Sequence, residues 1–431
     1  LQRTYVPQDA DDRTAGKIRT VAYNSLEYDD GTSLVARLSG EEVADYTESF
    51  NGAGTLTQTA YNFYRIGTEN LRAQDATSDD LNSQVNTYRG TYVPQDADDR
   101  TAGKIRTVAY NSLEYDDGTS LVARLSGEEV ADYTESFNGA GTLTQTAYNF
   151  YRIGTENLRA VDATSDDLNS QVNTYRGTYV PQDADDRTAG KIRTVAYNSL
   201  EYDDGTSLVA RLSGEEVADY TESFNGAGTL TQTAYNFYRI GTENLRAVDA
   251  TSDDLNSQVN TYRGTYVPTD ADDRTAGKIR TVAYNSLEYD DRTSLVARLS
   301  REEVADYTES FNGAGTLTQT AYNFYRIGTE NLRAVDATSD DLNSQVNTYR
   351  GTYVPVDADD RTAGKIRTVA YNSLEYDDGT SLVARLSGEE VADYTESFNG
   401  AGTLTQTAYN FYRIGTENLR AVDATSDDLN S

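Results

Sequence analysis

Apolar and polar residues alternate along several short stretches of this chain, and signals for tight turns separate the stretches. Alternation with a period of two is typical of β-strands that bury one face. The first pair of stretches is separated by Asp29-Asp30-Gly31, and the second pair by Asn51-Gly52-Ala53-Gly54. Asn-Gly or Asp-Gly between β-rich segments is the usual signal of a β-hairpin. The pattern therefore predicts strands over residues 19–28, 32–38, 43–50, 55–66, 70–74 and 83–93.

A helical interpretation stays open for parts of the same region. Ser39-Gly40-Glu41-Glu42 fits a helix capping box. Apolar residues follow this box at helical spacing, namely Val43, Tyr46 and Phe50. A bundle of helices is therefore the alternative to an all-β fold.

One segment of this pattern recurs along the whole chain. The sequence Thr-Tyr-Val-Pro places the only five prolines at intervals of 87 residues, at Pro7, Pro94, Pro181, Pro268 and Pro355. Aligning the copies leaves few differences between them. We number the repeats one to five, over residues 1–90, 91–177, 178–264, 265–351 and 352–431, with the fifth incomplete and the phase of the boundaries open.

The length and composition of the repeat indicate a domain with its own core. Most repeats that can fold only as part of a stack are 20–50 residues long, whereas 87 residues are enough for a small domain. A full repeat contains eleven Thr and seven Tyr, which favour strands. We therefore expect an all-β tandem array of five immunoglobulin-like β-sandwich modules, each with six or seven short strands.

A family resemblance agrees with this expectation. Tyr61-Asn-Phe-Tyr-Arg-Ile66 is followed a few residues later by a phrase that repeat two writes as Asn157-Leu-Arg-Ala-Val-Asp-Ala-Thr164. Together they resemble the late strands of fibronectin type III and cadherin-like modules, across about a quarter of each repeat. The tryptophan of many fibronectin type III modules and the full cadherin calcium motif are missing. The resemblance implies immunoglobulin-like modules in the stalk of a large bacterial surface adhesin.

Composition narrows the classes of function. The net charge of −33 repels nucleic acid and anionic membranes, so we expect neither as a partner. Without Cys or His the chain lacks the usual nucleophile–base pairs and the commonest transition-metal ligands. Nearly identical repeats also cannot each supply a different part of one catalytic site. We therefore expect no enzyme, and the sequence contains no apolar run long enough for a membrane span.

Clusters of acidic residues near the repeat boundaries are candidate calcium sites. Calcium takes six to eight oxygen ligands, several of them carboxylates. The candidate ligands are Asp9, Asp11, Asp12, Asp75, Asp79, Asp80, Asp96, Asp98 and Asp99. Bound calcium would neutralise like charges and stiffen the joint between modules. The alternative is that these are solvated loops that keep the protein soluble, because no EF-hand or related calcium motif is present.

These observations favour a structural role outside the cell. The first hypothesis is an extracellular stalk that extends a binding tip from a cell surface, with modules of about 35 Å each. The second is a subunit of a self-assembling filament or surface layer. The third is a repeated module that binds carbohydrate or a surface. Expected partners are other copies of the chain, laterally or head to tail, or a host or cell surface. Because the fifth repeat is incomplete, one route to self-assembly is β-strand addition at that repeat.

Overall fold

The computed structural model describes residues 7–14, 18–50, 54–290, 294–300, 302–377, 382–385, 387–414, 417–424 and 429–430. Residues 51–53 of the second predicted turn lie outside these ranges in repeat one. The same turn is described in repeat two.

The all-β class and the tandem arrangement are confirmed. The described residues form β-strands and five single-turn 3₁₀ helices, and they contain no α-helix. The helical bundle is thereby excluded for this part of the chain. None of the described helices is long and apolar enough to cross a membrane.

Each repeat contributes four classes of long strand. The first strands are β1 (Thr20–Ser25), β8 (Ile105–Ser112), β15 (Ile192–Ser199), β22 (Ile279–Ser286) and β29 (Ile366–Ser373). The second strands are β4 (Val43–Phe50), β11 (Val130–Phe137), β18 (Val217–Phe224), β25 (Val304–Phe311) and β32 (Val391–Phe398). The third strands are β5 (Leu56–Ile66), β12 (Leu143–Ile153), β19 (Leu230–Ile240) and β26 (Leu317–Ile327), and in repeat five β33 (Leu404–Tyr409) and β34 (Tyr412–Ile414). The last strands are β7 (Leu81–Arg89), β14 (Asn169–Arg176), β21 (Leu255–Arg263), β28 (Asn343–Arg350) and β36 (Leu429–Asn430).

Shorter elements lie between the long strands. A small hairpin follows each first strand and is formed by β2 (Glu27–Asp29) with β3 (Leu34–Ala36), β9 (Glu114–Asp116) with β10 (Leu121–Ala123), β16 (Glu201–Asp203) with β17 (Leu208–Ala210), β23 (Glu288–Asp290) with β24 (Leu295–Ala297), and β30 (Glu375–Asp377) with β31 (Leu382–Ala384). A short strand follows each third strand, namely β6 (Glu69–Arg72), β13 (Glu156–Arg159), β20 (Glu243–Leu245), β27 (Glu330–Arg333) and β35 (Glu417–Leu419). The 3₁₀ helices come next, as η1 (Ala73–Asp75), η2 (Ala160–Asp162), η3 (Ala247–Asp249), η4 (Ala334–Asp336) and η5 (Ala421–Asp423).

The chain divides into two compact units. The first comprises residues 1–146 and 160–165, and the second comprises residues 147–159 and 166–431. In the first unit the strands pair in the order β1–β4–β5–β7–β8–β11. In the second unit the order is β14–β15–β18–β19–β21–β22–β25–β26–β28–β29–β32–β33, with antiparallel neighbours throughout.

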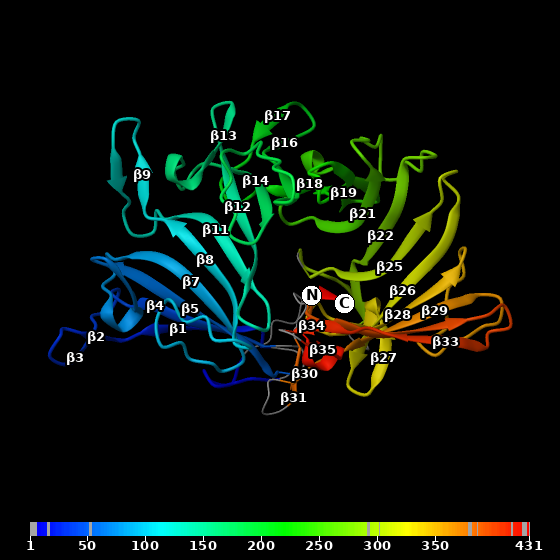
Figure 1. Cartoon of the computed structure of the whole chain (residues 1–431). Coiled ribbons are helices and arrows are strands. Elements are labelled where there is room, and N and C mark those ends of the chain that lie inside the picture. Colours follow the sequence, from blue (N-terminus) through cyan, green and yellow to red (C-terminus); the bar gives the residue numbers. More distant parts are fainter. Residues whose placement is uncertain are drawn as a thin grey trace. The chain divides into compact units, whose positions relative to one another are not determined.

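The pairing crosses the repeat boundaries, which corrects our expectation of modules with separate sheets. β21 ends repeat three, and it pairs with β22 of repeat four through Val259 opposite Ala283 and Thr261 opposite Thr281. Figure 1 shows these two strands side by side. The same pairing joins β7 to β8 and β28 to β29. Each described boundary is therefore a ladder inside one sheet, instead of a linker between two sandwiches.

Part of the buried core also crosses the repeat boundaries. Around the third boundary one cluster combines Tyr235, Phe237 and Tyr262 of repeat three with Ala271, Ile279 and Val282 of repeat four. In this cluster the apolar residues of repeat three are covered by residues of repeat four, whereas Val217, Tyr238, Ala247 and Ala250 form a second cluster within repeat three. A single repeat would leave Phe237 and Tyr262, now almost completely buried, without half of their neighbours.

β-Bulges explain why some segments look helical in sequence. In the pairing of β4 with β1, Tyr46 lies opposite Tyr23 and Ala44 lies opposite Asn24, so Asp45 is an extra residue. A second irregularity lies between Ser49 and Phe50 where β4 meets β5. A bulge shifts the inward-facing positions by one residue and breaks the period of two. Val43 and Phe50 are therefore both buried although they are seven residues apart.

The first predicted hairpin is divided differently from our expectation. The run over residues 19–28 breaks at Leu26, which is exposed, into β1 in the main sheet and β2 in the small hairpin. The small hairpin is anchored at its base. In repeat three, both carbonyls of Ala247 and Ala250, around η3, accept hydrogen bonds from the Arg211 guanidinium at 2.7 and 2.6 Å.

The turn between the second and third strands fits closely against the loop before the first strand. In repeat three, Gly228 has φ of +73°, and a Cβ atom on it would lie 2.8 Å from the carbonyl oxygen of Arg187. Gly241 has a similar φ of +61° and open space where its Cβ would be.

We expect Gly228→Ala to destabilise the second unit by about 2 kcal/mol and Gly241→Ala by about 1 kcal/mol, because both strain φ but only the first adds a clash with backbone. Denaturant titration followed by circular dichroism measures both. Equal losses would contradict the close approach of the turn to the loop.

Candidate functional site

Several buried polar side chains meet at the joint between consecutive repeats. We define the junction loop as residues 264–278, between β21 and β22, and the equivalent segments in other repeats. It contains Pro268 and the acidic cluster of Asp270, Asp272 and Asp273. The loop folds back over the end of the sheet, where Ala271 is buried in the boundary cluster.

A ladder of buried polar side chains on β21 holds the junction loop. Gln258 and Asn260 project from the same face and donate hydrogen bonds to the carbonyl oxygen of Ala271 at 2.7 and 2.8 Å. The Arg274 guanidinium donates to the same oxygen at 2.8 Å. The hydroxyl of Tyr262 donates to the carbonyl of Asp273 at 2.9 Å. Because Gln258, Asn260 and Tyr262 are almost completely buried, their polar atoms depend on the loop for partners.

The junction carboxylate Asp273 closes the loop on itself. Its Oδ1 accepts from the backbone N–H and the hydroxyl of Thr275, at 2.9 and 2.6 Å. Its Oδ2 accepts from the Tyr266 hydroxyl at 2.7 Å and from the Thr269 N–H at 3.1 Å. Partial burial alone would raise the pKa of this carboxyl, but the hydrogen bonds outweigh it and lower the pKa to about 2. The same causes lower the pKa of Asp360, in the next junction loop, to about 2.

Six of the nine predicted calcium ligands belong to such loops, in repeats one and two. Asp9 and Asp96 each accept a hydrogen bond from the backbone N–H two residues later, that of Asp11 and of Asp98. Asp12 accepts from the N–H groups of Gln8 and Thr14. Asp99 accepts from the N–H groups of Gln95 and Thr101 and from the hydroxyl of Tyr92. These carboxylates shape the loop through local hydrogen bonds.

The other three predicted ligands follow β6. Asp80 accepts from the N–H and hydroxyl of Thr77, and Asp79 is exposed. Asp75 lies in η1, where partial burial and then the charge of Asp29 raise the pKa of its carboxyl. Two facing carboxylates are fewer than the ligands that calcium takes. Within the described ranges no group of three or more acidic residues is arranged to hold a metal ion. Calcium binding stays a prediction.

A second set of links crosses the boundary at the opposite ends of the strands. The backbone N–H of Asn256, at the start of β21, donates to Glu303 of repeat four at 2.7 Å. The side-chain amide of Asn285, also in repeat four, donates to the carbonyl oxygen and to the side-chain oxygen of Asn256 at 2.9 and 3.1 Å. Ser300 donates to the Ser252 carbonyl at 2.7 Å. Glu216 and Asn198 bind Asn169 in the same way one repeat earlier.

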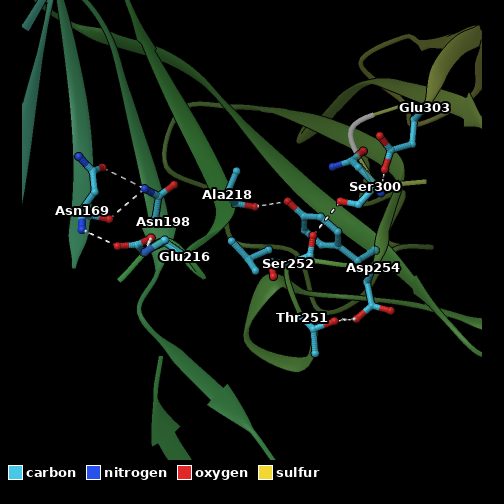
Figure 2. A pocket seen from close by; sticks show the side chains of 13 residues that line it. Asn169, Asn198, Glu216, Ala218, Thr251, Ser252, Asp254, Ser300 and Glu303 are labelled. Carbon is cyan, nitrogen blue, oxygen red and sulfur yellow. Dashed lines mark hydrogen bonds between the residues drawn. The ribbon is translucent and has the colours of Figure 1, made fainter. Parts of the chain in front are cut away.

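These links line a polar pocket of about 590 Å³ in the second unit. Figure 2 shows that Asn169, Asn198 and Glu216 lie at one end, and Ser252, Ser300 and Glu303 at the other. Tyr238 also lines the pocket, and its hydroxyl donates to the carbonyl of Ala218 at 2.6 Å. The lining side chains bind one another or backbone groups, and the only aromatic residue in the lining is the buried Tyr238. The pocket therefore belongs to the links between repeats.

Replacing Glu303 tests these links. We expect Glu303→Ala to destabilise the third boundary by about 1–2 kcal/mol, because the Asn256 N–H loses its charged acceptor. Glu303→Gln keeps an acceptor oxygen and should cost less. Hydrogen exchange at the Asn256 amide reports the change directly. An unchanged exchange rate in Glu303→Ala would show that this link contributes nothing.

Comparisons with known proteins assign neither family nor activity. No protein family matches the chain, and no curated protein matches it. Among solved structures, the chain is similar to the crystal structure of TcdB2-TccC3, with 11% sequence identity and a TM-score of 0.11. The match covers 88% of this chain and 18% of that chain. A likeness of this size says nothing about fold or function.

The residues that join the repeats were not predicted from the sequence. The signal was present as the alternation of Gln84, Asn86 and Tyr88 in the last strand. A period of two in polar residues normally indicates the solvent face of a strand. Here these positions face inward, because the junction loop supplies a carbonyl acceptor for the buried amides.

Proposed function

We propose that the chain is an extracellular structural extender, in which the number of repeats sets the length and no catalysis takes place. The observation that supports this most is the strand pairing across each described boundary, such as β21 with β22. Every repeat adds strands to the sheet, so adding repeats lengthens the assembly without a flexible linker. A role in the stalk of a bacterial surface adhesin fits this property, and so does the family resemblance in the late strands.

The strand geometry gives the extender a characteristic step. Each full repeat adds four long strands, and neighbouring strands are about 4.8 Å apart. An extender whose sheet stays open therefore grows by roughly 20 Å per repeat. Separate modules placed end to end would grow by about 35 Å, the length of one module.

Small-angle X-ray scattering of chains with three, five and seven repeats tests the proposal. We expect the maximum dimension to rise in equal steps of about 20 Å per repeat. A maximum dimension that stops growing would contradict an extender, because the sheet would then close on itself. The series in calcium and in chelator tests the stiffening of the junction loops. A larger increase in maximum dimension per repeat in calcium than in chelator supports stiffening of the junction loops. Identical scattering curves in the two buffers remove calcium from the proposal and leave the extender unchanged.

The exposed small hairpins favour a second candidate, a subunit that packs laterally in a filament or surface layer. In repeats two and three the second strand of the hairpin presents two exposed apolar residues, Leu121 with Val122 and Leu208 with Val209. Identical weak contacts repeated along one chain add up to strong binding. If this candidate is right, Leu208→Asp combined with Leu121→Asp reduces self-association at high concentration. Association that does not change would reject the hairpins as the packing surface.

A further inference from the structure

A row of five tyrosine rings crosses the sheet in repeats three and four. We define the tyrosine row of repeat three as Tyr197, Tyr220, Tyr235, Tyr262 and Tyr266, and that of repeat four as Tyr284, Tyr307, Tyr322, Tyr349 and Tyr353. In repeat three, consecutive ring centroids are 4.5, 5.2, 6.2 and 5.2 Å apart, which is the range of direct ring contact. The first four rings come from the paired strands β15, β18, β19 and β21, so the row runs in the direction in which the sheet grows.

A carboxylate accepts a hydrogen bond from the hydroxyl at each end of the row. Tyr197 donates to Glu222 at 3.2 Å, and Tyr266 donates to Asp273 at 2.7 Å. Both end rings are half-buried and reach solvent, whereas Tyr262 is completely buried. A phenol that loses an electron becomes a much stronger acid than a carboxylic acid, so it releases its proton to such an acceptor. The ends of the row are therefore the places where a tyrosine can be oxidised to a neutral radical.

Tyrosine is also the one readily oxidised type of side chain in the whole sequence. The chain has 34 Tyr and no Cys, Met, Trp or His. Cys and Met are ordinarily the first side chains that an oxidant consumes. An oxidising equivalent that enters the row therefore meets no sulfur, indole or imidazole side chain that would trap it.

A cation in the middle of the row keeps the oxidising equivalent at the ends. The Arg246 guanidinium lies 4.4 Å from the centroid of the Tyr235 ring, over its face. Like charges repel, so positive charge on this ring is less favourable than on Tyr197 or Tyr266. Tyr235 therefore passes the equivalent on, and the two ends hold it.

The rows of consecutive repeats adjoin at the junction loop. Arg274 donates to the Tyr284 hydroxyl at 3.0 Å and to the carbonyl oxygen of Asp273 at 3.4 Å. The Tyr262 hydroxyl donates to the same carbonyl oxygen at 2.9 Å. Tyr266 and Tyr284 pack against the same boundary cluster. One guanidinium and one carbonyl thus link the last rings of one row to the first ring of the next.

We propose that the tyrosine rows are a relay that carries an oxidising equivalent along the sheet from repeat to repeat. This inference does not depend on the extracellular role. A one-electron oxidant at the surface takes an electron from Tyr197, and the phenolic proton moves to Glu222, which leaves a neutral tyrosyl radical. An electron from Tyr266 then returns through the three rings between them. Glu222 gives the proton back to Tyr197, and Tyr266 releases its own proton to Asp273. A one-electron donor that reduces the Tyr266 radical, together with the proton from Asp273, restores the starting state.

A photosensitiser at one end of the row tests the relay in the intact chain. Because the chain has no cysteine, Glu201→Cys places a single thiol at an exposed residue near Tyr197 for a tris(bipyridine)ruthenium label. Light and a pentaamminechlorocobalt(III) quencher convert the label to ruthenium(III), which is the one-electron oxidant. A nitroso spin trap and mass spectrometry of tryptic peptides then locate the radical. The peptide of residues 264–274 contains Thr269, where earlier repeats have Gln, so its mass identifies Tyr266. We expect trapped radical at Tyr266, with a yield that does not change when the protein is diluted.

Substitutions inside and outside the row supply the controls. Tyr220→Phe combined with Tyr235→Phe keeps both rings but removes the oxidisable hydroxyls, so trapping at Tyr266 should fall to the level measured without light. Tyr238→Phe, on the same strand β19 but outside the row, should leave trapping unchanged. Trapping in the labelled peptide, which contains Tyr197, measures how much oxidant forms in each variant. Hydrogen exchange in β19 and β21 checks the sheet, and Tyr235→Phe alone replaces the double variant if that sheet is lost.

Three results would overturn the relay. The first is a parent chain in which no radical reaches Tyr266 although the labelled peptide is oxidised. The second is a row variant that traps as much radical at Tyr266 as the parent. The third is a loss in Tyr238→Phe as large as that in the row variant.

Discussion

Tyr235→Ala is expected to lower the free energy of unfolding of the second unit by about 3–5 kcal/mol, whereas Tyr409→Ala should lower it by less than about 1 kcal/mol. The two residues occupy the same position in identical strands. Tyr235 is covered by the last strand, and its ring contacts both Tyr220 and Tyr262. Tyr409 keeps the contact with the second strand, through Tyr394, but it is half exposed. Both substitutions replace the same residue in the same strand sequence, so intrinsic strand propensity cancels. The difference between the two losses of unfolding free energy therefore measures burial by the last strand.

The comparison requires a measurement that reports each repeat separately. Hydrogen exchange followed by mass spectrometry gives opening free energies for β19 and β33 in the same experiment. The effect of Tyr235→Ala should be largest in β18, β19 and β21 and fall off in repeats that do not touch them, as nearest-neighbour coupling in repeat arrays requires. Equal losses from the two substitutions would mean that the last strand does not cover Tyr235.

Acidification from pH 5 to pH 2 is expected to weaken the junction loops, with a loss of about 1 kcal/mol at each of the boundaries that contain Asp273 and Asp360, because solvent screens these partly exposed carboxyls. Hydrogen bonds lower the pKa of both carboxyls to about 2, from an ordinary value of 3.8. A lowered pKa in the folded state means that the unfolded state takes up the proton first. The stabilisation is therefore complete above about pH 5 and is lost as the pH falls through 4 to 2.

Asp273→Asn provides the matched control for this pH dependence. The amide keeps the shape of the side chain but does not titrate, so the third boundary should be weaker at pH 7 and almost independent of pH below 5. The fourth boundary, with Asp360, should keep its normal acid sensitivity in the same molecule. Hydrogen exchange in β22 and β29 at pH 7, 4 and 2.5, corrected for the intrinsic exchange rate, measures both. Parallel acid responses of the two boundaries in Asp273→Asn would contradict the role of this carboxylate.

The class of the fold could be predicted from composition and periodicity, because the strand signal depends on local residues. The Thr and Tyr content and the hairpin turns predicted strands at residues 43–50 and 55–66, close to β4 and β5. The break at Leu26 could not be predicted, because an exposed leucine in an alternating run has the same local pattern as a buried one. β-Bulges such as that at Asp45 also have no clear sequence signal, and they made a strand resemble a helix.

The pairing of repeats could not be predicted, because the length of a repeat does not reveal where its strands find partners. An 87-residue segment is long enough for its own core, yet the last strand needs β22 on one side and β19 on the other. Six of the nine candidate calcium ligands lie in junction loops, and their interpretation as ligands depended on charge alone. The structure adds the hydrogen bonds that the carboxylates of the junction loops accept, such as those of Asp273 from Thr275 and Tyr266.

Near-identity of the repeats follows naturally from a shared boundary. Each repeat must fit the next one through β21 with β22, Gln258 with Ala271 and Glu303 with Asn256. A substitution at one of these positions would have to suit two repeats at once. The described differences between repeats lie outside this set. Val356, which stands where repeat one has Gln8, is exposed.

A disulfide across one boundary tests the central claim, that the last strand of one repeat pairs with the first strand of the next. The chain contains no cysteine, so within one molecule two introduced cysteines can pair only with each other. Thr261 and Thr281 lie opposite each other in β21 and β22. Chains carrying Thr261→Cys and Thr281→Cys should form an intramolecular disulfide on mild oxidation, and Thr261→Cys with Thr194→Cys should not. Two free thiols in the first variant, or crosslinks formed only between molecules, would contradict pairing across the boundary.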